Sequence, residues 1–79
     1  MSDHATTKVI ALVAAELDVP PGKINAASSI DTIPEWDSMA HLNICLAVQD
    51  SFGIKLDMDT IGELTSVAAL AKLVDNAQA

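Results

Sequence analysis

The sequence predicts an all-α fold, a four-helix bundle with one short helix and a long loop between the first and second helices. Apolar residues recur three and four positions apart in separate segments, which is the spacing of helical faces, and no segment alternates in the manner of a strand. The 79 residues are 51% hydrophobic, so we expect residues 1–79 to form one small domain with a thin core. One Trp, one Phe and no Tyr make that core mainly aliphatic.

The first helix is expected to end before the Pro20–Gly22 segment, because two prolines followed by glycine stop a helix. Ser2 or Asp3 could cap its start through a side-chain oxygen. Its apolar face consists of Val9, Leu12, Val13 and Leu17.

Residues 18–37 are predicted to form a long loop, which is unusual in so small a domain and often functional. Prolines, a glycine, serines and an asparagine oppose regular structure throughout it. Four apolar residues recur along the loop and are expected to anchor it over the helices: Val19, Ile24, Ile30 and Ile33.

The second helix is expected to begin at Asp37-Ser38, with Asp37 as its N-cap, and to end at Gly53. We predict a buried stripe of Leu42, Cys45, Leu46 and Phe52, with Val48 near its edge.

Two further helices complete the prediction. After an Ile54–Leu56 connector, a short helix over Asp57–Glu63 would be capped by Asp57 and weakened by Gly62. Thr65 or Ser66 would cap the last helix. Its face is Val67, Leu70, Ala71 and Val74, with Leu73 beside it.

Charge and cysteine content exclude several classes of function. Four Lys and no Arg against eleven carboxylates give a net charge of −7, which argues against nucleic-acid binding and suits a basic protein partner, a cationic ligand or simple solubility. The single cysteine, Cys45, excludes an internal disulfide and a Cys-rich metal site.

The N-terminus lacks a signal-peptide pattern, and the longest apolar run, residues 9–15, is too short for membrane insertion. We therefore expect a cytoplasmic monomer.

Ser38 lies at a predicted helix N-terminus, a position that can accommodate a negatively charged group. The first amides of a helix lack intrahelical partners and the helix dipole is positive there, so a phosphate esterified to this serine would be well tolerated. The alternative from position alone is that Ser38 is an ordinary residue of a capped helix start.

The surrounding residues favour the first interpretation. Asp37-Ser38-Met39, followed by Leu42, Leu46 and Phe52-Gly53-Ile54, resembles the phosphopantetheine attachment region of acyl carrier proteins. The Glu63–Val67 segment is similar to the junction between the third and fourth helices of that family. Chain length, the long first loop and the acidic charge match as well, so the resemblance covers nearly the whole chain.

The resemblance implies a carrier and not an enzyme. Ser38 would hold a covalent 4′-phosphopantetheine, transferred from coenzyme A by a phosphopantetheinyl transferase, and acyl groups would be carried on it as thioesters. Asp37 is the acid of the motif, and Met39 stands where the family has a partner-contacting Leu or Met. The other partners implied are an acyl-loading ligase or acyltransferase and synthase enzymes, with Met39, Asp50 and Asp57 as candidate contacts.

An acyl cleft between the helices is a further expectation, because each buried CH₂ gains about 0.8 kcal/mol. The candidate lining residues are Leu42, Leu46, Ile54, Leu56, Ile61 and Leu64, together with Cys45 and Leu70. A plain packed core is the open alternative.

The second helix departs from the pattern of fatty-acid carriers, which display several carboxylates there. Its polar positions are His41, Asn43, Gln49, Asp50 and Ser51, of which only Asp50 is acidic, and more charge lies at Asp57, Asp59 and Glu63. Trp36–Met39 is similar to specialised stand-alone carriers. Fatty-acid, polyketide and specialised lipid biosynthesis all stay open. So do an aminoacyl or peptidyl carrier of the same fold and an unmodified acidic helical interaction module.

Other groups of residues give weaker indications of function. Ser38 and His41 share a helical face, but no nucleophile elbow or oxyanion hole is identifiable, so we expect no hydrolase and a solvated or partner-facing His41. Asp57–Gly62 fails as a calcium loop, because position five is Ile61 and position twelve is Ala68, and we expect no metal site. Cys45 is expected to be a core residue, and Trp36 to pack the loop against the second helix.

Overall fold

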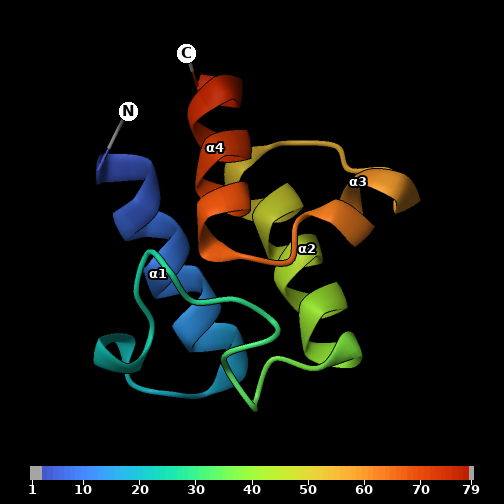
Figure 1. The fold of residues 1–79 in the computed structure, drawn as a ribbon. Coiled ribbons are helices and arrows are strands. Elements are labelled where there is room, and N and C mark those ends of the chain that lie inside the picture. Colours follow the sequence, from blue (N-terminus) through green and yellow to red (C-terminus); the bar gives the residue numbers. More distant parts are fainter. Residues whose placement is uncertain (1–2, 79) are drawn as a thin grey trace.

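The computed structural model describes residues 3–78 and contains four α-helices, one of them short, with no strand among those residues (Figure 1). A long loop, interrupted by a 3₁₀ turn, joins the first two helices. The elements in order are α1 (Asp3–Leu17), η1 (Pro21–Lys23), α2 (Ser38–Phe52), α3 (Met58–Glu63) and α4 (Val67–Gln78). The predicted all-α fold is confirmed.

Helix α1 is the centre of the bundle, because it packs against both α4 and α2. Figure 1 shows α1 and α4 side by side, with the start of α1 and the end of α4 at the same end of the molecule. The predicted faces of these helices are buried, apart from half-buried Leu12 and Leu73. The buried core of the helices includes Val9, Val13, Ile44, Val48, Val67, Leu70 and Val74, each 0% exposed.

Asp18, and not the proline pair, ends α1. It adopts a left-handed conformation with φ 57°, which aspartate tolerates better than most residues that have a side chain. The Val19 amide donates to the Ala14 carbonyl at 3.0 Å and the Asp18 amide to the Ala15 carbonyl at 3.3 Å. This is the Schellman arrangement usually closed by glycine.

The long loop is built into the core, as its apolar residues predicted. Ile24 and Ile33 are buried, Val19 and Ile30 are half-buried against the core, and Trp36 is 1% exposed. Trp36 therefore packs the loop inward, as expected.

Two backbone hydrogen bonds fasten the middle of the loop to the start of α4. The Ile30 amide donates to the Thr65 carbonyl at 2.9 Å, and the Val67 amide donates to the Ser28 carbonyl at 3.0 Å. The result is an isolated antiparallel bridge between Ser29 and Ser66. It holds together two segments that are far apart in the sequence.

The buried face of α2 differs from the predicted stripe. The residues inside are His41, Ile44, Cys45 and Val48. Leu42 and Leu46 are 40% and 50% exposed, and Phe52 is half-buried. Both sets have helical spacing, and they differ by a rotation of one residue, about 100°. The prediction was wrong because His41 was assigned to solvent, which placed the apolar stripe on the wrong side of Cys45.

Local capping agrees with the prediction. Asp57 Oδ1 accepts a hydrogen bond from the Thr60 amide at 2.7 Å, and Ser66 Oγ accepts one from the Ala69 amide at 3.1 Å. Ser66 rather than Thr65 is thus the cap of α4. Gly53 closes α2 in the left-handed conformation, with φ 66°. Ser2, a candidate cap of the first helix, lies outside the described residues, and nothing is described of the Asp3 side chain.

The assignment of the buried face can be tested with two substitutions in one helix. We expect Ile44→Ala to lower the free energy of unfolding by about 2–5 kcal/mol, because it leaves a cavity in the core. Leu46→Ala, at a half-exposed position, should change it by less than about 1 kcal/mol. Urea denaturation followed by circular dichroism measures both, and equal losses would contradict the assignment.

Candidate functional site

Ser38 is exposed and is the first residue of α2. Asp37 before it is extended, with φ −98° and ψ −175°, and its Oδ1 accepts a hydrogen bond from the Ala40 amide at 2.9 Å. The predicted N-cap is therefore confirmed. Because the cap is Asp37, the Ser38 hydroxyl is not needed to start the helix and faces solvent as the following residue.

The position suits a phosphate ester. Helix α2 is 15 residues long, and its first amides carry the positive end of the helix dipole. The exposed hydroxyl leaves room for a bulky substituent. Trp36, two residues before the serine, is 1% exposed and His41, three residues after it, is 7% exposed, so buried side chains anchor the chain on both sides of Ser38.

Large apolar side chains lie exposed along α2 and at the start of α3. The apolar surface, as we call it, consists of Met39, Leu42, Leu46 and Met58, which are 71%, 40%, 50% and 79% exposed. Met39 directly follows the serine, and Leu42 lies one helical turn further on. An apolar partner or cargo meeting the protein here would remove this surface from water.

Apart from the exposed Leu42 and Leu46, the residues predicted to line an acyl cleft divide into two groups. Cys45 and Leu70 are fully buried and Leu64 is 6% exposed, so these belong to the core. Ile54, Leu56 and Ile61 are half-buried at the surface formed by the connector and α3. A hydrogen bond from the Leu56 amide to Gln49 Oε1, at 2.8 Å, holds the connector against α2.

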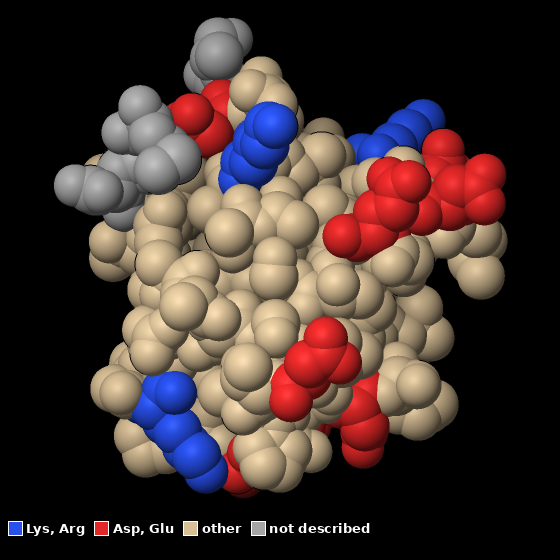
Figure 2. All heavy atoms as spheres, in the orientation of Figure 1, with Lys and Arg blue, Asp and Glu red and all other residues tan. Residues whose placement is uncertain are grey.

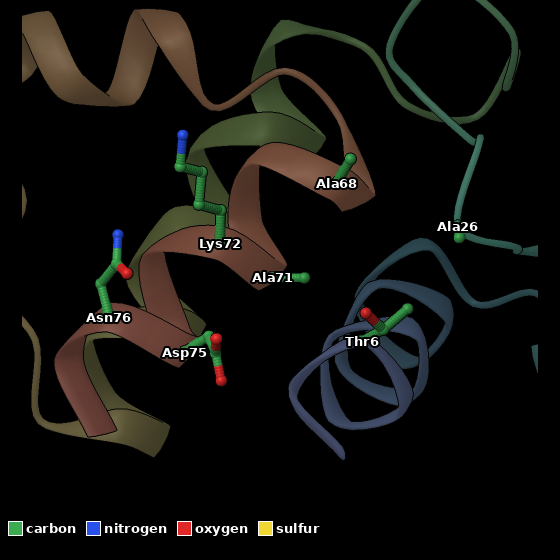
Figure 3. Close-up of a pocket in the computed structure, with 7 residues that line it drawn as sticks. All are labelled: Thr6, Ala26, Ala68, Ala71, Lys72, Asp75 and Asn76. Carbon is green, nitrogen blue, oxygen red and sulfur yellow. The ribbon is translucent and has the colours of Figure 1, made fainter. Parts of the chain in front are cut away.

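Two hollows are found on the described part of the molecule. One, of about 490 Å³, lies between α1, the loop and α4 (Figure 3). It is lined by Thr6, Ala26, Ala68, Ala71, Lys72, Asp75 and Asn76. The other, of about 470 Å³, is a shallow depression between α1 and α2. Neither is lined by Ser38 or by the predicted cleft residues.

Charged side chains are sparse on much of the face shown in Figure 2, where acidic groups gather over the α3 end of the molecule. Asp37, Asp50, Asp57, Asp59 and Glu63 are all exposed. Exposed carboxylates on the elements that also carry the apolar surface favour basic partners over acidic ones.

Two of the carboxylates are held in their charged form. The Lys23 ammonium donates to Glu35 Oε2 at 2.7 Å, and this hydrogen bond lowers the pKa of Glu35. The Thr60 amide lowers the pKa of Asp57 in the same way. Burial instead raises the pKa of the Cys45 thiol, which keeps it neutral.

His41 is buried, and the expectation of a solvated or partner-facing side chain is wrong. Its Nδ1 accepts a hydrogen bond from Trp36 Nε1 at 3.0 Å, and its Nε2 donates to the Ile61 carbonyl at 2.7 Å. Both ring nitrogens are therefore engaged away from Ser38, and His41 is not placed to act as its general base. The signal that was missed is the i, i+3, i+4, i+7 spacing of His41 with Ile44, Cys45 and Val48.

No helix in the described range is both long and apolar enough to cross a membrane. Residues 3–78 also contain no cluster of three or more His, Cys, Asp or Glu side chains arranged to hold a metal ion.

The described residues form a small helical bundle with an exposed serine at the start of its second helix, where a group can be attached without disturbing the fold. The family model described as "Phosphopantetheine attachment site" matches residues 7–74, and the chain belongs to this family. A comparison with curated proteins finds no match. Domains of this family are non-catalytic carriers with covalent 4′-phosphopantetheine, and they interact with a phosphopantetheinyl transferase and with pathway enzymes.

The cap of α3 should respond to acid. Because the Thr60 amide stabilises the Asp57 carboxylate, the pKa of Asp57 lies below its ordinary value, and the cap persists until the pH falls through that lowered value. NMR titration should show the Thr60 amide signal moving in this strongly acidic range. Asp57→Ala should abolish the movement and fray α3 at neutral pH. An unchanged Thr60 titration in this variant would contradict the assignment.

Proposed function

We propose that Ser38 is the attachment residue for 4′-phosphopantetheine and that this protein carries acyl groups on it. The observation that supports the proposal most is the exposed hydroxyl at the first position of α2, directly after the Asp37 cap and inside the matched residues 7–74. A transferase can reach this hydroxyl without unfolding the helix, because Asp37 and not Ser38 holds the N-terminus.

The bound group supplies a thiol at the end of a flexible arm, to which acyl groups attach as thioesters. The protein's own residues do the rest. The first amides of α2 stabilise the phosphate charge, and Asp37 keeps the helix start in place. The buried residues on either side, Trp36 and His41, keep the attachment point fixed relative to the core.

We further propose that partner enzymes bind the apolar surface and the carboxylates around it. Met39 is 71% exposed beside Ser38, and Asp50 and Asp57 are exposed on α2 and at the start of α3. Asp50 is the one acid of α2 itself. A partner would therefore bring an apolar patch with a few basic residues, rather than the strongly basic surface that a carboxylate-rich helix would need.

An acyl cargo fits this surface better than a polar one. Leu42 and Leu46 lie exposed on α2, and Ile54, Leu56 and Ile61 are half-buried on the adjoining connector and α3. An acyl chain resting there would gain about 0.8 kcal/mol for each CH₂ it buries. This supports acyl transfer in fatty-acid, polyketide or specialised lipid biosynthesis over aminoacyl carriage.

Attachment is tested by intact mass after incubation with coenzyme A and a broad-specificity phosphopantetheinyl transferase. The wild-type protein should gain one phosphopantetheine, and Ser38→Ala should gain none. Ser51→Ala is the matched control, because Ser51 is an exposed serine near the other end of the same helix, and it should be modified like the wild type. The proposal would be overturned if the Ser38→Ala variant were modified, or if several transferases failed to modify the folded wild-type protein.

Cargo contact is tested with the protein loaded directly from octanoyl-coenzyme A by the same transferase. We expect Leu46→Ser to speed cleavage of the thioester by hydroxylamine about fourfold, which corresponds to lost contact with one CH₂, about 0.8 kcal/mol. Asn43→Ser, at an exposed polar position on α2, is the control and should leave the rate unchanged. Equal rates in all three proteins would show that the chain does not rest on this surface.

A further inference from the structure

A buried chain of hydrogen bonds joins three parts of the molecule around His41. Trp36 Nε1 donates to His41 Nδ1 at 3.0 Å, and His41 Nε2 donates to the Ile61 carbonyl at 2.7 Å. Trp36 and His41 are 1% and 7% exposed, and their ring centroids are 6.0 Å apart. We call this chain the His41 bridge. It connects the end of the long loop, the first turn of α2 and α3.

The two partners determine the protonation state of the ring. An indole nitrogen is only a donor, and a backbone carbonyl is only an acceptor. Both bonds can form at once only when the imidazole is neutral, with its proton on Nε2 and a free lone pair on Nδ1. A second proton on Nδ1 would place an N–H against the indole N–H, and neither could donate to the other.

Helix α3 is short and has few contacts that hold it to the rest of the molecule, and the His41 bridge is one of them. It has six residues, Met58–Glu63, and none of them is buried. It is held by the Asp57 cap, by Leu64 at its end and by the bond from His41 to the Ile61 carbonyl. Few buried contacts make a segment the first to open.

The described residues form no ion pair that would stabilise a charged His41 ring. The titratable groups on the end of the loop, α2 and α3 are Glu35 with Lys23, Asp37, Cys45, Asp50, Asp57, Asp59 and Glu63. Cys45 Sγ lies 3.7 Å from His41 Nε2 and is a neutral thiol. Glu35 is paired with Lys23, and the other carboxylates are exposed. Among the described residues no carboxylate forms an ion pair with His41.

We propose that the His41 bridge is a proton-operated latch, which is closed when the ring is neutral and opens when Nδ1 takes a proton from solvent. Protonation breaks the bond from Trp36, leaves the buried indole N–H without an acceptor and places an unpaired charge in the core. The end of the loop and α3 are then released together, and deprotonation restores both. The surface beside Ser38 thereby changes shape with pH. The latch goes beyond the proposed carrier function and is independent of it, since it is measured on the unmodified protein.

The chain provides its own reporter, because Trp36 is its one tryptophan and gives the one indole N–H signal in an NMR spectrum. The experiment lowers the pH from about 8 and follows that signal together with the hydrogen-exchange protection factors of α3, until the ring nitrogen signals of His41 report the second proton. We expect the indole signal to move with the same midpoint as the His41 ring. The α3 protection factors should fall about tenfold or more, while those of α1 and α4 stay nearly constant.

His41→Gln is the matched control, because a glutamine amide offers one acceptor and one donor and does not titrate. This variant should keep α3 protected at pH 8, and α3 should stay protected at the pH at which the wild-type ring carries its second proton. His4 is retained in it, so any response due to that exposed histidine would persist.

The wild-type protein alone can overturn the proposal, should the variant fail to fold. Ring nitrogen shifts of His41 at pH 8 must show the proton on Nε2. A proton on Nδ1 instead, an indole signal that follows His4 or does not move, or loss of protection spread equally over all helices would each show that no latch exists.

Discussion

The structure depends on the burial of its long loop. A chain of 79 residues with few aromatic side chains has a thin core, and ordering a twenty-residue loop costs conformational entropy. Ile24, Ile33 and Trp36 offset that cost by entering the core. The backbone bridge between Ser29 and Ser66 then fastens the loop to the start of α4. The loop thus behaves as a structural element, and it delivers the chain to α2 in a defined position.

The position of the proposed site follows from the way the buried loop leads into α2. Trp36 is buried, Asp37 caps the helix and Ser38 emerges at the surface, all within three residues. Rotation of α2 to bury His41 and Ile44 turns Leu42 and Leu46 outward. The orientation of α2 therefore both fills the core and exposes the apolar surface. One face of α2 therefore anchors the helix in the core, and another face exposes apolar side chains to solvent.

The histidine near the serine illustrates how a carrier differs from an enzyme. His41 has the residue type and the spacing of a general base, yet both of its ring nitrogens are occupied by Trp36 and Ile61. Its chemistry is used to join segments of the chain. This agrees with a family whose members supply attachment and delivery while their partners catalyse.

The sequence by itself determined whatever depends on neighbours within a few residues. Helical spacing predicted the faces of α1 and α4, and the caps Asp37 and Asp57 were visible as side chains able to bond amides three positions ahead. Only the tertiary structure decided which side of α2 is buried, because two stripes one residue apart have the same spacing. Helical spacing places His41 on one face with Ile44 and Val48, but its hydrogen-bond partner at Ile61 lies twenty residues away, and only the tertiary structure shows that contact.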